Sequence, residues 1–217
     1  MKEVLISPGA NGALHAFLLA FLNKGDEVVV IEPCFPLYLD HIRLSDATIK
    51  HVPLEIKDNG KFELNLDILR KAFSDKTKIF LWNNPNNPTG KNYTREEIEA
   101  VSIILEEFPH VVVISDEVYD FLVFDQGKHT LFANVRNNWN KTISIFSGGK
   151  LFSATGWKVG WSIGPENLIR MGGIIANTTF YCSGSIQQVA FGKTLHKLTE
   201  PGYEGELSFQ DCQRRDF

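Results

Sequence analysis

The chain has 217 residues, of which 43% are hydrophobic and 22% are charged, a balance typical of a globular domain and not of a disordered segment. Its 22 basic and 26 acidic residues give a formal net charge of −4 and are interspersed along the sequence. This pattern predicts neither nucleic acid nor a membrane surface as a partner.

The cysteines and histidines give no sign of a metal site. Cys34, Cys182 and Cys212 are far apart and form no Cys-x-x-Cys pair, which argues against structural zinc and favours a reducing compartment. The histidines are isolated in the sequence, so we predict that none of them binds a metal: His15, His41, His51, His110, His129 and His196.

The first element is an apolar run, residues 4–7, which predicts a strand. A turn at residues 8–12 and a helix over residues 13–22 follow. A strand-to-helix junction presents free backbone N–H groups and the positive end of the helix dipole, which suit a phosphate. An ordinary turn without a ligand is an equally good interpretation, and the glycine spacing does not support a dinucleotide site.

A second buried strand is predicted over residues 27–31, and Phe35 follows it directly. An aromatic side chain at the end of a strand can face a ligand, although packing in the core is the commoner outcome. Further along, the sequence predicts a strand at residues 48–53, a loop at 58–60 and a short helix at 67–73.

A third buried strand, residues 77–82, ends in a turn rich in proline and asparagine. The prolines restrict the backbone, so Asn83 and Asn87 have fixed directions, either toward a ligand or only to form the turn. A capping box at residues 94–97 opens a helix that runs to residue 108.

The next apolar strand, residues 111–115, leads into Asp116 and Tyr119. A carboxylate at the end of such a strand is costly unless it is paired with a cation or a protonated nitrogen, so Asp116 is the residue that most needs a ligand.

The region around Lys150 follows a polar stretch at residues 134–140, predicted to be a surface loop, and a strand at residues 142–146. Lys150 lies among Ser147, Gly148 and Gly149, in a loop with little side-chain bulk, as a Schiff-base lysine requires. On its own, a solvated surface lysine is the better interpretation. A strand at residues 157–164 follows too closely to allow a helical crossover, so we predict that it is antiparallel. Helices are predicted from residue 165 and over residues 186–198.

This alternation of strands and helices predicts an α/β fold: one domain, residues 1–217, with a doubly wound, mostly parallel sheet and one antiparallel strand. In such a sheet, ligands bind at the carboxyl ends of the strands.

Three motifs occur in order at strand ends: residues 83–90, 115–119 and 147–158. Together they resemble the pyridoxal-phosphate-dependent aminotransferases of fold type I. The run Phe-Ser-Ala-Thr-Gly-Trp-Lys-Val-Gly-Trp, residues 152–161, is most similar to the group of kynurenine aminotransferase, glutamine transaminase K and cysteine-conjugate β-lyase. The resemblance runs from Glu3 to about Ala190 and corresponds to the large domain of that family.

The resemblance implies a role for each matched residue. Lys150 would hold pyridoxal 5'-phosphate as an aldimine and move protons, and Asp116 would pair with the pyridinium nitrogen. Tyr119 and Asn87 would hydrogen-bond the phenolic oxygen, and Phe35 would stack on the ring. Asn83 matches a contact to the ring side or to the substrate carboxylate. The phosphate would be held by Ala10, Asn11, Ser147 and Lys158.

The implied reaction is transamination of an aromatic, glutamine-like or sulfur amino acid with a 2-oxo acid. Gly148 and Leu151 differ from the residues that usually flank the lysine in this subgroup, which leaves the substrate class open. Two alternatives stay open: a β-lyase that uses the same cofactor, and a non-catalytic truncated form that acts as an interaction protein.

Members of the family are longer than this chain and carry a small domain with an arginine that binds the substrate carboxylate. We therefore expect a fragment, truncated at both ends, with weak or no turnover, and assign that role to neither Arg214 nor Arg215. The resemblance further implies a homodimer. The cytoplasm is the expected location, or the mitochondrion if a presequence precedes residue 1.

Overall fold

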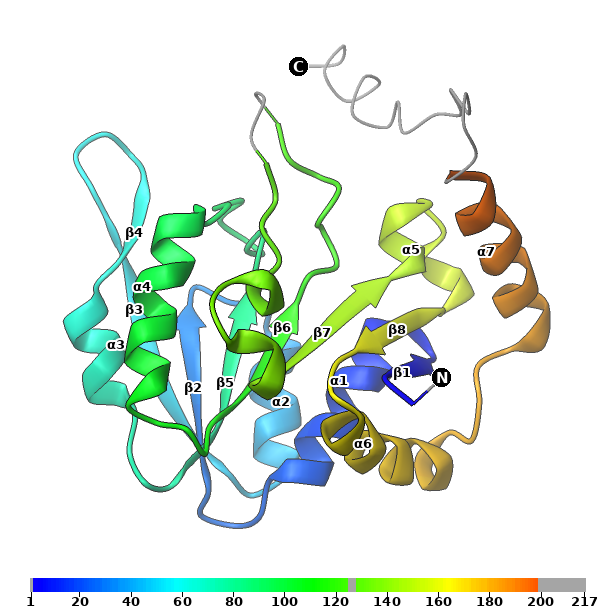
Figure 1. Ribbon diagram of the computed structural model, residues 1–217, viewed down its shortest axis with the longest axis horizontal. Helices are drawn as coiled ribbons and strands as arrows, with labels where there is room; N and C mark the ends of the chain where they lie inside the picture. Colours follow the sequence, from blue (N-terminus) through cyan, green and yellow to red (C-terminus); the bar gives the residue numbers. More distant parts are fainter. Residues whose placement is uncertain (1, 125–127, 199–217) are drawn as a thin grey trace.

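The computed structural model describes residues 2–124 and 128–198. Its strands form one eight-stranded sheet in the order β1-β8-β7-β6-β5-β2-β3-β4 (Figure 1). Their bounds are Val4–Ser7 for β1, Glu27–Glu32 for β2, Thr48–Ile56 for β3, Phe62–Leu64 for β4, Thr77–Asn83 for β5, Val112–Asp116 for β6, Thr142–Ser147 for β7 and Gly160–Ile163 for β8.

The α-helices are α1 (Gly9–Phe21), α2 (Leu37–Leu44), α3 (Leu66–Ala72), α4 (Arg95–Glu106), α5 (Gly148–Leu151), α6 (Glu166–Thr179) and α7 (Ser185–Leu198). Short 3-10 helices are η1 (Phe132–Asn134), η2 (Asn138–Lys141) and η3 (Thr155–Trp157). Across the two described ranges, none of the helices is both long and apolar enough to cross a membrane.

The sheet is mostly parallel, as the sequence predicted. Strands β3, β2, β5, β6 and β7 run parallel to one another, and β8 is antiparallel to β7 on one side and to β1 on the other. The strand expected to reverse direction after Lys150 is therefore β8. The expectation of a single antiparallel strand was wrong, because β4 also pairs antiparallel with β3. Its three residues are too few to give a periodic signal in the sequence.

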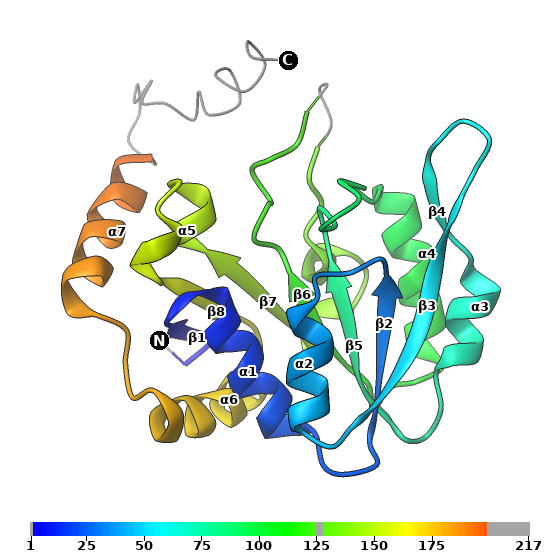
Figure 2. The ribbon, with the colours of Figure 1, turned by 180° about the vertical axis from the view of Figure 1, so that it is seen from behind.

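Alternate side chains of the buried strands pack into two hydrophobic cores, one on each face of the sheet. In β2, Val28 and Val30 pack with helices α1, α2 and α6, whereas Val29 and Ile31 pack with α3, α4 and η1. Helix α4 covers one face in Figure 1, and Figure 2 shows α1 and α2 on the opposite face. Burial on both faces explains why the central strands are almost continuously apolar.

The register of the sheet places polar groups from distant segments in common rows. Asn83 of β5 pairs with Asp116 of β6, and Asp116 pairs with Ile145 of β7. Farther along, Gly160 of β8 pairs with Ser7 of β1 and with Ser147 of β7. Both rows lie at the carboxyl ends of the parallel strands, where the sequence predicted a ligand site.

Two local predictions were wrong. The polar stretch at residues 134–140 is not simply a surface loop, because it contributes to η1 and η2 and buries Val135 and Asn138. The Asn138 amide is satisfied inside by Ser102 Oγ at 2.7 Å and by the Phe132 carbonyl at 3.1 Å. Lys150 was expected in a loop but lies in the one-turn helix α5, which Ser147 caps.

The capping box was predicted correctly. The Thr94 hydroxyl accepts from the Glu97 N–H, and the Glu97 carboxylate accepts from the Thr94 N–H at 2.8 Å. These contacts satisfy backbone donors that the helix itself leaves free, and they fix where α4 begins. Helix α4 then buries Ile98, Val101 and Leu105 against the sheet.

Candidate functional site

A cavity of about 270 Å³ lies at the carboxyl ends of β5, β6 and β7 and next to the start of α1. It brings together side chains from six segments of the chain. All of the site residues predicted from the sequence line it: Ala10, Asn11, Phe35, Asn83, Asn87, Asp116, Tyr119, Ser147, Lys150 and Lys158.

One end of the cavity is formed by the N-terminus of α1. The predicted turn at residues 8–12 is in fact the first turn of this helix, which begins at Gly9 and contains no acidic residue there. Ala10 and Asn11 lie in this first turn, where backbone N–H groups have no partner within the helix. The 13-residue helix therefore directs donors and the positive end of its dipole at the cavity.

Lys158 and Ser147 lie at the same end. Lys158 has a left-handed backbone, with φ of 52°, two residues before the start of β8. A Cβ atom built on Gly9 would lie 3.8 Å from the Lys158 Cα, so the start of α1 and the lysine are close neighbours. A cation, a hydroxyl and free N–H groups together form a chemically sufficient anion site.

Lys150 lines the cavity from α5. Its backbone N–H donates to Ser147 Oγ at 3.3 Å, which fixes the start of α5. The ammonium Nζ lies 5.5 Å from the centroid of the Tyr119 ring, within the range of a cation–π contact. The amine therefore faces the aromatic residue that follows β6.

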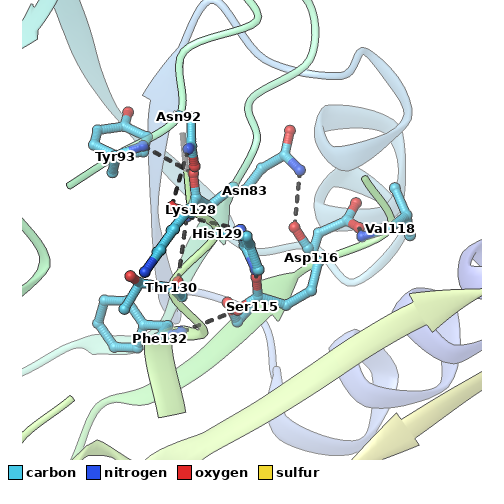
Figure 3. Close-up of polar contacts among 12 residues, drawn as sticks. Asn83, Asn92, Tyr93, Ser115, Asp116, Val118, Lys128, His129, Thr130 and Phe132 are labelled. Carbon is cyan, nitrogen blue, oxygen red and sulfur yellow. Dashed lines mark hydrogen bonds and ion pairs between the residues drawn. The ribbon is translucent and has the colours of Figure 1, made fainter. Parts of the chain in front are cut away.

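Asp116 ends β6 and presents its carboxylate to the cavity. Oδ2 accepts a hydrogen bond from the Tyr38 hydroxyl at 2.5 Å. Oδ1 accepts from the N–H of Val118, which lies beside Asp116 in Figure 3, at 3.3 Å. Burial raises the pKa of Asp116 to about 6; the Glu117 charge also raises it, while these hydrogen bonds and Lys150 oppose the shift. A protonated nitrogen placed beside this carboxylate would stabilise its ionised form.

The two asparagines of the turn after β5 are held by the backbone. Asn83 Nδ2 donates to the Asp116 carbonyl at 2.9 Å, as Figure 3 shows, and Asn83 Oδ1 accepts from the Asn87 N–H at 2.7 Å. The polar atoms of Asn83 thus take part in forming the turn, which is one of the two roles that the sequence allowed. Asn87, whose N–H is held in this way, also lines the cavity.

Sequence reasoning missed Tyr38. Its side chain is buried, and burial raises the pKa of its hydroxyl well above the ordinary value, with the Asp116 charge as a second cause. Phe35 packs edge-on against it, with 5.6 Å between ring centroids. The tyrosine reaches the cavity because α2 begins at Leu37, a helix that the residues after Pro36 did not reveal.

Sequence reasoning also missed a buried polar cluster behind Asp116. Glu117 is 0% exposed and lies 2.8 Å from His129, which the sequence had suggested was isolated. His15 and His41 also meet, with their Nδ1 atoms 3.2 Å apart. No signal in the sequence pairs these residues, because each pair comes from separate elements.

Metal ligation was not expected, and the described ranges contain no group of three or more His, Cys, Asp or Glu side chains arranged to hold an ion. Cys34 and Cys182 are unpaired. Burial raises the pKa of the Cys34 thiol to about 11, helped by the charge of Glu32, so Cys34 is not a ready nucleophile. Cys212 lies outside the described residues.

Comparison with known proteins gives the family context. The sequence pattern of the family described as "Aminotransferase class I and II" matches residues 1–198. The chain is 38% identical to a kynurenine–oxoglutarate transaminase of Dictyostelium discoideum, over all of this chain and 53% of that protein. It is 36% identical to human kynurenine–oxoglutarate transaminase 1, over 84% of this chain and 45% of that protein.

Solved structures give the same picture. An N-succinyldiaminopimelate aminotransferase from Mycobacterium tuberculosis superposes with a TM-score of 0.91 and 35% identity, over 99% of this chain and 55% of that one. An aspartate aminotransferase from Thermus thermophilus gives a TM-score of 0.82 and 29% identity, over 91% and 50%. The chain spans about half the length of the relatives that it matches.

Proposed function

The chain belongs to the aminotransferase class I and II family, and from this premise we propose that it binds pyridoxal 5'-phosphate at Lys150 and serves transamination. The substrates that we propose are an aromatic, glutamine-like or sulfur amino acid and a 2-oxo acid. Relatives named kynurenine–oxoglutarate transaminases support this choice. The observation that carries the proposal is the convergence of an amine, a carboxylate and an anion cradle on one cavity.

The residues present fit this cofactor chemically. Burial raises the pKa of Asp116 to about 6, so the carboxylate lacks a full cationic partner, and a protonated ring nitrogen would provide one. Lys158, Ser147 and the first turn of α1 line the same cavity and suit the phosphate. Phe35 also lines this cavity and offers an aromatic ring.

When bound, pyridoxal phosphate supplies an electron sink for the electron pair that is left when the substrate Cα–H bond breaks. Lys150 Nζ would attach the cofactor and, once displaced by the substrate amine, would take the proton from the substrate Cα and deliver it to C4′ of the cofactor. Asp116 would keep a proton on the ring nitrogen by accepting its hydrogen bond. Tyr119 and Asn87 would donate hydrogen bonds to the phenolic oxygen and so lower its basicity.

The test is spectroscopic. Pyridoxal phosphate is added to the protein, the visible absorption spectrum is recorded, and the adduct is reduced with borohydride and mapped by mass spectrometry. We expect a visible band and a pyridoxyl group on Lys150, and neither in the Lys150→Ala variant. A stable label on another lysine, or the same spectrum in the variant, would refute the proposal.

Turnover is tested separately with kynurenine and oxoglutarate. Formation of glutamate from oxoglutarate would support transamination. Formation of pyruvate and ammonia from a sulfur amino acid, with no oxo acid present, would indicate a β-lyase instead. For residues 1–217 on their own we propose weak turnover, because they span about half the length of the relatives that they match.

We also propose a homodimer in the cytoplasm. Family membership supports the dimer, and the two unpaired cysteines, Cys34 and Cys182, fit a reducing compartment. Light scattering of the purified protein tests the first of these, and microscopy of a tagged chain tests the second.

A further inference from the structure

Glu117 is a buried carboxylate that the proposed chemistry does not use. It is 0% exposed, and it does not line the cavity although Asp116, Val118 and Tyr119 around it do. A carboxylate in such a place is costly unless it is paired and hydrogen-bonded. Its contacts therefore indicate what it does for its neighbours.

The Glu117 carboxylate connects β6 with the start of η1 at Phe132. Its Oε1 atom accepts from the Ser115 hydroxyl at 2.6 Å and from the Phe132 N–H at 3.1 Å. Figure 3 shows Ser115 and Phe132 converging on this point from the two segments. One carboxylate oxygen thus ties the end of the strand to the start of η1.

The other carboxylate oxygen faces His129. Oε2 lies 2.8 Å from His129 Nε2, but neither atom makes an aligned hydrogen bond, so the contact is a close polar pair. On the far side of the ring, Asn84 Nδ2 lies 3.5 Å from Nδ1; in the tautomer that accepts from this amide, the ring proton is on Nε2, on the side of Glu117. Asn84 is anchored in turn, because its N–H donates to the Asp116 carbonyl at 3.1 Å.

The backbone around Glu117 carries this anchoring into the cavity. The Glu117 N–H donates to the Ile145 carbonyl at 2.9 Å, and its carbonyl accepts from the Asp120 N–H at 3.0 Å. Val118, whose N–H holds Asp116 Oδ1, and Tyr119, whose ring faces Lys150, lie between these two bonds. Because the side chain and the backbone of Glu117 are both held by hydrogen bonds, the positions of Val118 and Tyr119 are restricted as well.

We propose that Glu117 and His129 are positioning residues: their buried pair holds the turn at residues 117–120 so that Asp116 and Tyr119 face the cavity. The inference rests on the proposed function for its meaning, since these are the residues proposed to contact the cofactor. The geometric part concerns the protein alone and can be measured without cofactor.

The variants are chosen to separate positioning from general stability. His129→Leu removes the polar partner, whereas His129→Gln can place an amide N–H near the position of Nε2 and should restore the contact. His110→Gln is the matched control, because His110 is exposed and its Nε2 lies 3.3 Å from the Ser74 carbonyl, away from Glu117 in the sequence.

Hydrogen exchange of the cofactor-free protein is the first measurement. Loss of a buried polar partner costs about 1–3 kcal/mol, so His129→Leu should speed exchange of the Val118, Asp120 and Leu122 amides about tenfold or more. The amides of β2 and β5 should be unchanged, and so should all amides in His110→Gln. His129→Gln should lie close to the wild type.

The second measurement is the visible circular dichroism of bound pyridoxal phosphate, which reports how the ring is held. We expect His129→Leu to lose most of this signal and about tenfold in affinity, and His129→Gln to keep both. A wild type that binds no cofactor would refute the proposed function, while exchange would still decide the inference.

Unchanged exchange in the turn, or equally faster exchange in every element, would overturn the positioning role. So would unchanged circular dichroism in His129→Leu. If His129→Leu does not fold, Glu117→Gln replaces it: its amide sets a donor against Nε2 while Oε1 keeps its bonds to Ser115 and Phe132, and the same local increase in exchange is expected.

Discussion

The hydroxyl of Tyr38 in α2 donates a hydrogen bond to Asp116 Oδ2 at the end of β6, although 78 residues separate the two in the sequence. One oxygen of the acid proposed to meet the cofactor is therefore already committed to the protein. This leaves the carboxylate in a fixed orientation and makes its proton affinity depend on a residue in another element.

Removing the hydroxyl in Tyr38→Phe should raise the pKa of Asp116 above about 6, because this hydrogen bond opposes the effect of burial. A hydrogen bond to a charged group contributes about 1.5–3 kcal/mol, so the rise should be about one pKa unit or more. NMR titration of the Asp116 carboxyl carbon measures it.

Tyr93→Phe is the control for this substitution. Tyr93 is equally buried, and its hydroxyl has no hydrogen-bond partner within the part of the chain that the structure describes. The pKa of Asp116 should stay unchanged in this variant. An equal shift in both variants would mean that the Tyr38 hydrogen bond does not control Asp116.

Asp116→Asn should stabilise the cofactor-free protein at pH 7.5 and abolish tight cofactor binding. The folded-state pKa of about 6 is above the ordinary aspartate pKa of 3.8, so the native state binds the proton more tightly and loses stability as pH rises through this window. The full penalty is present above pH 6, and a shift of this size corresponds to at most about 3 kcal/mol.

Urea unfolding at two pH values tests this sign. The gain from Asp116→Asn should be about 1–3 kcal/mol at pH 7.5 and should largely disappear near pH 4, where the wild-type carboxyl group is protonated in the native state. A variant that is less stable than the wild type at pH 7.5, or whose gain does not depend on pH, would contradict the raised pKa.

Lys158→Gln should weaken binding of pyridoxal phosphate about tenfold or more, because a charge-assisted contact to the phosphate is lost. Binding of pyridoxal, which lacks the phosphate, should be unaffected. Lys71→Gln is the control, since Lys71 is exposed on α3, on the opposite face of the sheet. Equal weakening for both ligands would place Lys158 away from the phosphate.

Gly160→Ala should destabilise the fold strongly. A Cβ atom there would lie 2.6 Å from Ala10 N and from the Gly9 carbonyl carbon, and 2.9 Å from the Phe146 carbonyl oxygen, all of them backbone atoms that cannot turn aside. We expect a loss of about 2–4 kcal/mol, as for other overpacked sites in a close-packed interior, and weaker binding at the start of α1.

Gly156→Ala provides the comparison, because a Cβ atom at Gly156 would meet nothing within 4 Å. Its midpoint of thermal unfolding should match that of the wild type. If both glycine variants unfold at the wild-type temperature, the close approach of β8 to α1 is not a packing constraint.

The sequence allowed the central strands, and the residues that line the cavity, to be predicted because their signals are local. Continuous apolar runs such as Val28 to Ile31 indicate strands that are buried on both faces, and each ends at a polar residue that the parallel sheet then places at one edge. Even the reversed direction of β8 followed from the short connection after Lys150.

What could not be predicted depends on contacts between distant elements. The helix that brings Tyr38 to Asp116 follows a proline and has mixed polarity, and neither Glu117 nor His129 has a local pattern that pairs it with the other. Asn138 gives a polar signal in the sequence but is buried, because Ser102 and the Phe132 carbonyl satisfy its amide. Such residues become interpretable only once the packing is known.

The row formed by Ser7, Gly160 and Ser147 has a consequence for how the site tolerates change. Main-chain hydrogen bonds between the strands keep the three residues paired in one register. A single-residue insertion or deletion within any of these short strands would therefore shift the Ser147 hydroxyl relative to Lys158. Cavity residues outside this row, such as Leu37, are not tied to its register. They can therefore change in evolution without moving Ser147 or Gly160 along the sheet.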